Sequence, residues 1–356
     1  MSHQSDSADR LRIRTLKLSG LNEMPEPSAH VPEVWFFILP CDRRVADAER
    51  IARWCECLQQ FVAGLHEQSV VGILTTPEDA ALTWPKLASL LHFQLWVAVK
   101  LADPPSGSST RLPEHHAALL ILTKSHASLR HTKTRIGYSY CPACDKTTKD
   151  YGGKKHTYHE YGTLMSDVWR DIAYTPGQST DPIVARLADL FGLEPYRQIT
   201  VVHLEEVLRQ PPHLTRPQIL YTSHDPAQTP SRLINGDCLE ELRRLPDNSI
   251  EFCFADPPYN LSKRYDSWDD ALDISQYFRW CDEWLNELAR VLRPGCTCAV
   301  LNIPLWAIRH FQHLKDRLSF QNWIVWEGLG LPVRMIMPAH YAILCFAKGE
   351  PRPLPG

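Results

Sequence analysis

The stretch FADPPYNLSKRYDSWDD, residues 254–270, combines residue types that can do chemistry. The Asp256 carboxylate and the Pro257 carbonyl are hydrogen-bond acceptors, and together they could accept both N–H bonds of one amine. Pro257 and Pro258 fix the backbone and donate no hydrogen bond, so they would hold this carbonyl rigidly. Tyr259 adds a flat ring on which another ring can stack. The alternative is a turn that only ends a strand, because Asp-Pro is common in turns.

Asp-Pro-Pro-Tyr after an apolar strand resembles the catalytic signature of the DNA amino-methyltransferases. The longer stretch INGDCLEELRRLPDNSIEFCFADPPYN resembles the layout of their β-class, and the resemblance covers residues 231–348. It implies transfer of a methyl group from S-adenosylmethionine to the exocyclic amine of adenine (N6) or, as the weaker alternative, of cytosine (N4). Asp rather than Ser at the head of the tetrapeptide favours adenine.

The resemblance also implies roles for single residues. The amine would be polarised by Asp256 and the Pro257 carbonyl, and the flipped base would stack on Tyr259. The expected catalytic residues are therefore Asp256, Pro257, Pro258 and Tyr259. The residues expected to bind the cofactor are Asp237, Cys238 and Asp256. The residues expected to contact DNA are Asn260, Lys263 and Arg264, with Lys149, Lys154 and Lys155 from an earlier segment.

One feature of the family is missing from the expected place. The family ends in a strand and a Phe-x-Gly-x-Gly loop around the methionine part of the cofactor, but nothing similar follows Lys348. The Gly-x-Gly near Gly328 follows a different strand and lacks the phenylalanine. The catalytic copy is therefore expected to be incomplete: either the natural protein is longer or the missing strand comes from elsewhere. This absence favours one alternative, a catalytically inactive DNA-binding or specificity subunit or fragment. A further alternative is methylation of RNA or of a protein amide, which uses related tetrapeptides typically headed by Asn, so Asp256 counts against it.

The chain also resembles itself. Three segments recur in the same order with nearly constant separation, which indicates a domain-sized repeat. The matching pairs are 53–65 with 279–292, 93–100 with 320–327, and 114–124 with 338–348. Residues 38–41, ILPC, stand where the second copy has Asp-Pro-Pro-Tyr. The first copy is therefore interpreted as a degenerate methyltransferase domain without its acid.

Alternating strand and helix patterns place these residues in an α/β fold with two tandem Rossmann-like methyltransferase domains, the second incomplete. In the second copy we expect strands at 232–237, 249–255, 296–303, 322–327 and 340–348, and helices at 238–246, 273–292 and 304–318. Asp256 would follow a strand at its carboxyl end, where such sheets bind ligands. The expected domains are a flexible tail (1–30), the degenerate domain (31–210) with an insert (138–162), a linker (211–230) and the catalytic domain (231–356).

The insert carries a Cys/His pattern. Cys141, Cys144, His156 and His159 form C-x2-C-x11-H-x2-H, which predicts a tetrahedral zinc site, although the final spacing is tighter than the common one. Lysines alternate with tyrosines in this segment, and such a mixture suits phosphate contact and base stacking. A solvated basic loop is the alternative.

Composition limits the remaining possibilities. The formal net charge is −3, so a DNA-binding surface would have to be local. The 11 cysteines follow no signal peptide and are expected to be mostly reduced. No apolar run is long enough to span a membrane. We therefore expect a cytoplasmic protein, encoded by a bacterium, a phage or a mobile element, that binds double-stranded DNA, with a cognate restriction endonuclease as a candidate partner.

Overall fold

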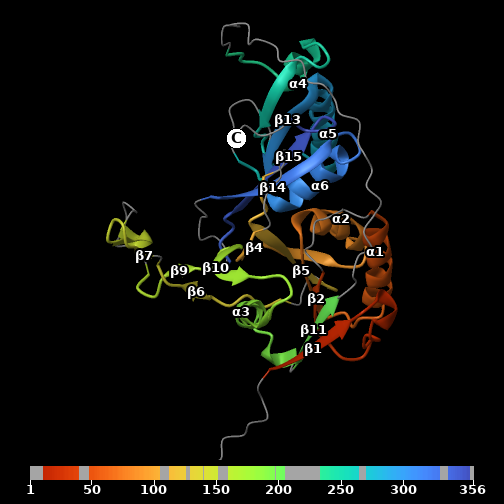
Figure 1. Ribbon diagram of the computed structural model, residues 1–356, viewed down its shortest axis with the longest axis vertical. Coiled ribbons are helices and arrows are strands. Elements are labelled where there is room, and N and C mark those ends of the chain that lie inside the picture. Colours follow the sequence, from red (N-terminus) through yellow and green to blue (C-terminus); the bar gives the residue numbers. More distant parts are fainter. Residues whose placement is uncertain are drawn as a thin grey trace, which may run out of the picture. The chain divides into compact units, whose positions relative to one another are not determined.

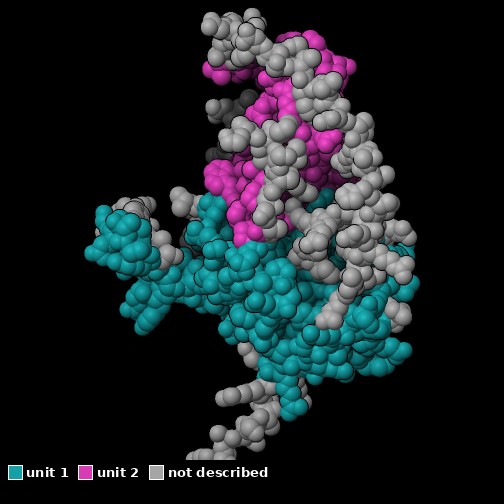
Figure 2. All heavy atoms as spheres, in the orientation of Figure 1, with its two compact units in different colours: residues 1–103, 116–208, 327–340 teal, residues 104–115, 209–326, 341–356 magenta. Residues whose placement is uncertain are grey.

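The computed structural model describes residues 11–39, 48–104, 112–125, 129–138, 140–150, 159–196, 198–204, 233–263, 270–328 and 336–352 (Figure 1). These residues belong to two compact units, which Figure 2 shows in different colours. Unit 1 comprises residues 1–103, 116–208 and 327–340, and unit 2 comprises residues 104–115, 209–326 and 341–356.

Strands and helices alternate from β2 to β4 and from α4 to β14, as the patterns predict, whereas β4 to β10 and β14 to β15 follow one another without an intervening α-helix. The strands are β1 (Arg12–Leu18), β2 (Val34–Ile38), β3 (Val70–Thr75), β4 (His92–Leu101), β5 (His116–Thr123), β6 (Arg135–Ile136), β7 (Tyr140–Cys141), β8 (Lys146–Thr147), β9 (Thr163–Leu164), β10 (Val168–Tyr174), β11 (Gln198–Leu204), β12 (Ile250–Ala255), β13 (Leu292–Asn302), β14 (Ser319–Glu327) and β15 (His340–Ala347). The α-helices are α1 (Ala48–Ala63), α2 (Pro77–Leu87), α3 (Asp181–Phe191), α4 (Cys238–Arg244), α5 (Ile274–Val291) and α6 (Pro304–Leu314).

Unit 1 contains a seven-stranded sheet in the order β1-β11-β2-β3-β5-β4-β10. Strand β2 lies inside this sheet and all of its residues are buried, because helices cover both of its faces. On one face the rings of Trp35 and Phe37 pack against Phe61 and Trp54 of α1. On the other face Val34 and Phe36 belong to the same core cluster as the apolar side of α3.

Unit 2 contains a four-stranded sheet in the order β12-β13-β15-β14, in which β12 and β13 are parallel and β13 and β15 antiparallel. Helices α5 and α6 cover one face. Phe311 of α6 packs on Phe320 and Phe346 at ring distances of 5.1 and 6.0 Å. Both helices begin where expected: the Asp273 side chain caps α5, and Pro304 opens α6. Helix α6 ends at Leu314, four residues before the predicted end.

Two sequence expectations about strands are wrong. Residues 12–18 were expected in a flexible tail, but they form β1, which pairs in parallel with β11. Most of β1 is exposed, so the ladder with β11 rather than a buried face stabilises it. Conversely, residues 233–236 were expected in a strand but form none. Leu233 is fully exposed there and Ile234 is 59% exposed, since no described strand lies beside them to form a ladder.

The division into units also differs from the predicted domain limits at two hairpin connections. Residues 327–340, between β14 and β15, belong to unit 1, where Ile336 joins the hydrophobic core. Residues 104–115, between β4 and β5, belong to unit 2, where the Leu112 carbonyl accepts a hydrogen bond from Asn322 at 3.2 Å. Contacts between residues far apart in the sequence decide this exchange, and such contacts are not visible as a sequence period. The predicted linker, residues 211–230, lies outside the described residues.

Asp167 fastens residues 337–340 to the rest of unit 1. Its Oδ1 accepts hydrogen bonds from the backbone N–H groups of Ala339 and His340, at 2.8 and 2.9 Å. The Asp167 N–H donates to the Met337 carbonyl at 3.3 Å. Because the carboxyl group is buried, its pKa rises from 3.8 to about 6 in spite of these two donors.

The raised pKa predicts how Asp167→Asn changes stability with pH. The folded chain binds a proton at Asp167 more tightly than the unfolded chain does. This proton therefore stabilises the fold fully below pH 4, and its contribution is lost as the pH rises through 6. The amide oxygen of asparagine can accept the same two hydrogen bonds without a charge. Between pH 4 and pH 7 the free energy of unfolding of the variant should rise by about 3 kcal/mol relative to that of the native chain. This figure follows from a shift of about two pKa units at about 1.4 kcal/mol each. Urea unfolding of unit 1 across this range measures the difference. Asp103→Asn, at an exposed position, is the control. The prediction would be contradicted if the difference in unfolding free energy between Asp167→Asn and the native chain did not increase with pH.

Candidate active site

The Asp-Pro-Pro-Tyr tetrapeptide follows the carboxyl end of β12. This strand ends at Ala255, and Asp256 is the next residue. The Tyr259 hydroxyl donates a hydrogen bond to Asp256 Oδ1 at 2.8 Å, which leaves Oδ2 of the carboxylate for another donor. Tyr259 itself is 9% exposed. The structure therefore brings together the acid and the ring that the sequence predicts to act in one site.

Two helices hold the backbone of this tetrapeptide. Tyr277 of α5 donates its hydroxyl proton to the Pro258 carbonyl at 2.8 Å. Trp306 of α6 donates its indole N–H to the Tyr259 carbonyl at 2.8 Å. The Pro257 carbonyl accepts no hydrogen bond from the described residues. The loop is thus fixed at two carbonyls, while the third remains available as an acceptor.

A buried polar chain continues from Tyr277 into unit 2. Asn302, the last residue of β13, lies 3.4 Å from the Tyr277 hydroxyl and 3.0 Å from His310 Nε2. All three side chains are fully buried. Burial lowers the pKa of His310 to about 3, so its ring is neutral, and burial raises the pKa of Tyr277. These three hydrogen-bonded side chains are neutral, so they can position the tetrapeptide but place no charge near a ligand.

The segment after the tetrapeptide is pinned by Asp270, which is 2% exposed. Its two carboxylate oxygens accept hydrogen bonds from the backbone N–H groups of Asn260, Leu261 and Lys263 at 2.8–2.9 Å. Asn260 has a positive φ of 54°, and its side-chain amide exchanges two hydrogen bonds with the Leu272 backbone. Asn260, predicted to contact DNA, therefore shapes the loop in this structure.

Lys263 and a row of rings lie next to the tetrapeptide. The Lys263 ammonium is 5.5 Å from the centre of the Tyr259 ring. The Tyr341 ring lies 6.0 Å from Tyr259 and 5.9 Å from Trp326, which is 53% exposed. Arg264, predicted to contact DNA, lies outside the described residues. The contact between Lys263 and Tyr259 keeps a positive charge beside the candidate site.

Two of the three residues predicted for the cofactor lie at the start of α4, and the third, Asp256, follows β12. Asp237 is the N-cap of this helix, and its Oδ1 accepts hydrogen bonds from the N–H groups of Leu239 and Glu240. Cys238 follows it and is exposed. In the described part of unit 2, glycine occurs at Gly236, Gly295 and Gly349, and none of them forms a glycine-rich turn after a strand. These residues alone do not fit a complete S-adenosylmethionine cradle, because the methionine half has no turn to surround it.

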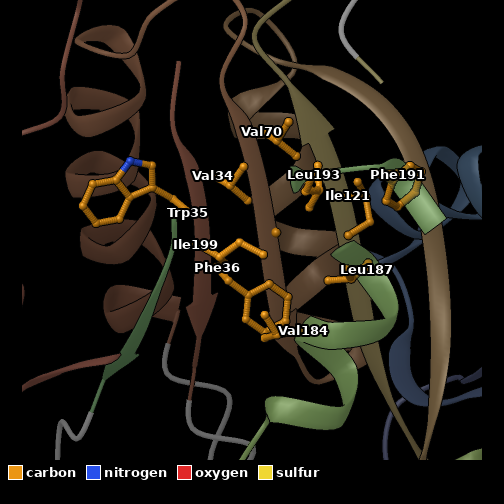
Figure 3. A pocket seen from close by; sticks show the side chains of 11 residues that line it. Val34, Trp35, Phe36, Val70, Ile121, Val184, Leu187, Phe191, Leu193 and Ile199 are labelled. Carbon is orange, nitrogen blue, oxygen red and sulfur yellow. The ribbon is translucent and has the colours of Figure 1, made fainter. Parts of the chain in front are cut away.

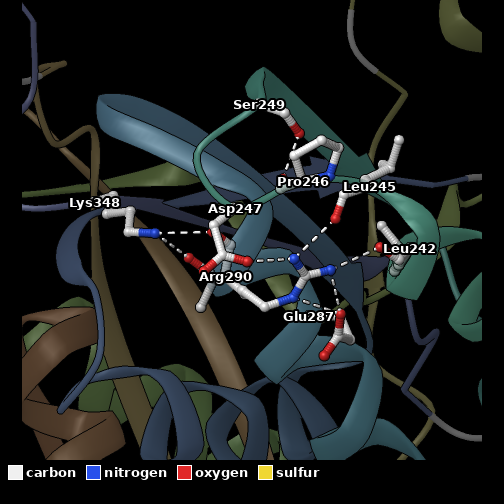
Figure 4. Close-up of polar contacts among 9 residues, drawn as sticks. Leu242, Leu245, Pro246, Asp247, Ser249, Glu287, Arg290 and Lys348 are labelled. Atoms are coloured by element: carbon white, nitrogen blue, oxygen red, sulfur yellow. Dashed lines mark hydrogen bonds and ion pairs between the residues drawn. The ribbon is translucent and has the colours of Figure 1, made fainter.

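An arginine connects α4, β12 and α5 (Figure 4). Arg290, near the end of α5, donates hydrogen bonds to the Leu242 and Leu245 carbonyls and forms ion pairs with Asp247 and Glu287. Lys348 donates to the backbone carbonyls of residues 289 and 290. These contacts fix the turn that leads into β12 and thereby the direction in which the strand delivers Asp256.

The predicted zinc ligands are described only in part. Cys141 and Cys144 lie in the β7–β8 hairpin, where the Cys144 thiol points to the Cys141 carbonyl at 3.9 Å. His159 is described, but His156 is not, and neither are Lys154 and Lys155. Among the described residues no three metal-ligating side chains converge. Lys149 is described and lies 5.9 Å from the Tyr138 ring.

Sequence reasoning missed four residues of the site, namely Tyr277, Trp306, Asn302 and Asp270. Tyr277 and Trp306 have the spacing of ordinary core aromatics, so nothing in the sequence marks their hydrogen bonds. Asn302 carried a usable signal, because it is a polar residue at the carboxyl end of the strand next to β12. No helix in the described part of the chain is long and apolar enough to cross a membrane.

Known proteins resemble the C-terminal part of the chain. The DNA methylase family model matches residues 250–355, which include the tetrapeptide. Type II methyltransferase M.BamHI of Bacillus amyloliquefaciens is 40% identical over 122 residues, which are 33% of this chain and 29% of the relative. M.HpaI of Haemophilus parainfluenzae is 36% identical over 122 residues, 33% of this chain and 38% of the relative.

A solved structure, the cytosine-N4-specific PvuII DNA methyltransferase, aligns with 20% identity and a TM-score of 0.27 over 33% of this chain and 49% of that one. The chain thus spans less than two fifths of the length of the two curated relatives. The family-model match falls on the segment whose β12, tetrapeptide and flanking helices form the site described above. Residues 250–355 of this chain are therefore similar to the DNA methylases of the N6/N4 family.

Proposed function

We propose that this protein is an S-adenosylmethionine-dependent DNA methyltransferase that modifies the exocyclic amine of adenine at N6 or, as the weaker alternative, of cytosine at N4. One observation carries the proposal: Asp256 and the Pro257 carbonyl, which accepts no hydrogen bond from the described residues, stand together at the carboxyl end of β12, inside the matching segment. The substrate is double-stranded DNA, and a restriction endonuclease is the partner expected for a modification enzyme of this kind.

The chemistry follows from the two acceptors. An exocyclic amine is a poor nucleophile because its lone pair is delocalised into the base. If Asp256 Oδ2 and the Pro257 carbonyl each accept one N–H, the nitrogen moves toward tetrahedral geometry and its lone pair becomes available. The Tyr259 hydroxyl holds Oδ1 and so sets the rotation of the carboxylate. S-adenosylmethionine supplies the methyl group in this class of reaction.

The target base must leave the duplex before these acceptors can reach it. Tyr259 is the ring expected to stack on the flipped base, with Tyr341 behind it and Lys263 beside it. Removing a base from the stack costs a few kcal/mol, which aromatic stacking on the protein offsets in part. The lysine charge near the ring would favour the approach of the phosphate backbone.

Methyl transfer to a pool of adenine- and cytosine-containing duplexes tests the proposal. The wild-type chain should transfer a labelled methyl group, and digestion of the DNA to nucleosides should then give N6-methyladenine rather than N4-methylcytosine. Calorimetric titration with S-adenosylmethionine, with and without DNA, measures cofactor binding separately. DNA binding with neither heat from the cofactor nor methylated product would overturn the proposal.

A binding module without catalysis is the second candidate. It is favoured by the lack of a glycine-rich turn in the described part of unit 2 and by the use of Asp237 as a helix cap. In unit 1, Ile38 and Leu39 stand where the acid would be, so this unit is proposed as a degenerate copy that serves as a scaffold or reads DNA. A binding module would retain its whole function when Asp256 is replaced.

Zinc binding by Cys141, Cys144, His156 and His159 is a further part of the proposal, supported by the hairpin that presents the two cysteines. Purified protein should contain about one zinc ion per chain by mass spectrometry, since four such ligands complete a tetrahedral site. Cys141→Ser should remove most of it, whereas Cys57→Ser in α1 should not. Equal and negligible zinc in all three proteins would contradict the prediction.

A further inference from the structure

A row of three aromatic rings runs along one edge of the sheet in unit 2. Asn302, the last residue of β13, pairs with Ala342, so Tyr341 lies near the start of β15, at the edge where the tetrapeptide follows β12. The Tyr341 ring is 6.0 Å from the Tyr259 ring and 5.9 Å from the ring of Trp326, near the end of β14. The row therefore begins at the tetrapeptide and ends at Trp326.

Trp326 is the most exposed of the tryptophans that the structure describes, at 53%. Trp96 and Trp323, by contrast, are each 1% exposed and belong to the packed interior. Single exposed apolar side chains are common on protein surfaces and need no function. Trp326 is not single, because it continues a row that starts at a candidate catalytic residue. Its chain neighbour Glu327 is ion-paired with Arg170 at 3.0 Å, so the adjacent negative charge is compensated.

The rings in the row do not cover one another's faces. The Tyr341 ring is tilted by 41° against Tyr259 and by 45° against Trp326, rather than stacked on either. A tilted contact leaves more of a ring face open than a stacked one does, and Trp326 stays half exposed. The Lys263 ammonium, 5.5 Å from the centre of the Tyr259 ring, places a positive charge at the start of the row. Rings in series beside a cation are typical of surfaces that bind unpaired bases next to a phosphate backbone.

The internal repeat supplies a comparison for two of these rings. Residues 320–327 match residues 93–100, so Trp326 corresponds to Val99. Residues 338–348 match residues 114–124, so Tyr341 corresponds to Ala117. Val99 and Ala117 are register partners in unit 1, where β5 and β4 are neighbours as β15 and β14 are in unit 2. The same two places in the sheet therefore carry rings in one unit and small aliphatic side chains in the other.

In unit 1 these two aliphatic side chains belong to the core. Val99 is 0% and Ala117 is 1% exposed, and both are in the cluster that contains the apolar side of α3. Figure 3 shows Ile121, which lies on the same face of β5 as Ala117, close to Leu187 of α3 in an apolar pocket. A sheet with this strand order thus folds without rings at these places.

The first copy also has Cys41 at the place of Tyr259, so the copy that lacks the acid lacks all three rings. Rings that the fold does not need, in the copy that carries Asp256, point to a task at the candidate site. We propose that Trp326 stacks a second nucleobase, the neighbour of the target base in the same DNA strand, while Tyr341 separates it from Tyr259. The inference rests on the proposed function for the identity of the strand, and it adds a residue that binds a base other than the methylated one.

Stacking of bases on aromatic rings is sequence-tolerant, so the inference can be tested without knowledge of the recognition site. The probe is a single-stranded oligonucleotide of mixed sequence and about 12 nucleotides, within the usual range of site sizes. An abasic strand of the same length carries the same phosphates without bases and is the ligand control. Fluorescence anisotropy of the labelled strands, titrated with the full-length chain, measures both affinities.

Trp326→Ala should weaken binding of the base-containing strand about tenfold, as is typical when one stacking ring is lost, and change binding of the abasic strand less than about twofold. Trp326→Phe keeps a ring and should retain most of the affinity. Both variants should fold, because the side chain is half exposed. Phe252→Ala removes a ring that is 61% exposed on β12, outside the row. It is the matched control and should bind both strands as the native chain does.

Fluorine NMR of the chain labelled with 5-fluorotryptophan locates the contact. The resonance that is missing from Trp326→Phe identifies Trp326, and it should shift with the base-containing strand but not with the abasic strand. No binding of the base-containing strand at about 100 µM, the weak end of non-specific affinities, overturns the inference. An unchanged affinity of Trp326→Ala, an equal loss for both strands, or a Trp326 resonance that does not move also overturns it.

Methyl transfer by the same proteins is measured separately. Base-dependent binding through Trp326 in a chain that transfers no methyl group would leave the stacking role standing and count against the proposed function alone. Methyl transfer by a chain whose Trp326→Ala variant binds the base-containing strand as tightly as the native chain would support the proposed function and overturn this inference.

Discussion

Replacing Asp256 with alanine is expected to lower methyl transfer by roughly 10²–10³-fold, the loss typical when one preorganised electrostatic group is removed from an active site. In the proposed reaction the carboxylate is one of two acceptors for the amine, and nothing described nearby replaces it. DNA affinity should stay within about twofold, since phosphate contacts supply most of it. Asp256→Asn separates charge from geometry, because the amide oxygen can still accept the Tyr259 hydroxyl proton. Single-turnover transfer of labelled methyl groups and gel-shift titration measure the two effects.

Asp316→Asn is the matched control, since this carboxylate lies on the surface, with its side chain 72% exposed. It should leave both readouts unchanged. If Asp256→Ala transferred methyl groups at the native rate, the carboxylate would not be the acceptor. If the native and variant chains both bound DNA and neither transferred methyl groups, the protein would be better explained as a DNA-binding module without catalysis.

The sequence predicted the elements that depend on local signals. Asp273 and Pro304 mark helix starts through capping and through a fixed φ, and the structure places α5 and α6 there. The tetrapeptide was found because proline and aspartate break the apolar run of β12 at its end. Each of these signals lies within a few residues of the feature that it predicts.

The errors have the opposite origin, because they depend on partners far away in sequence. β1 exists through its ladder with β11, 186 residues later by the register of Arg12 with Gln198. Residues 233–236 begin with two apolar residues, Leu233 and Ile234, but lack such a ladder. A strand is a property of a pair, so neither outcome could be derived from its own residues. Asp270 was missed for a different reason, because its three backbone donors are 7 to 10 residues away and only the loop conformation brings them to it.

The hydrogen bond from Tyr277 to the Pro258 carbonyl leads to the second large effect. Tyr277→Phe keeps the ring in the core but leaves the partly buried Pro258 carbonyl without its donor and removes a neighbour of Asn302. Unit 2 should lose about 1 kcal/mol of stability, the usual net contribution of one hydrogen bond. The Pro257 carbonyl is the next one along the same loop, so its direction should become less defined. We expect kcat to fall about tenfold, equivalent to about 1.4 kcal/mol, with an unchanged KM for DNA.

The split between kcat and KM distinguishes positioning from simple destabilisation, which would lower the amount of active protein and leave kcat per folded chain intact. Tyr196→Phe is the matched control, because Tyr196 also donates to a backbone carbonyl, that of Gln68 at 2.9 Å, in unit 1. It should lower stability without changing kcat. A Tyr277→Phe variant that is less stable but fully active per folded chain would show that the tetrapeptide keeps its geometry through its prolines alone. In that case the two prolines, rather than α5, would set the direction of the acceptor.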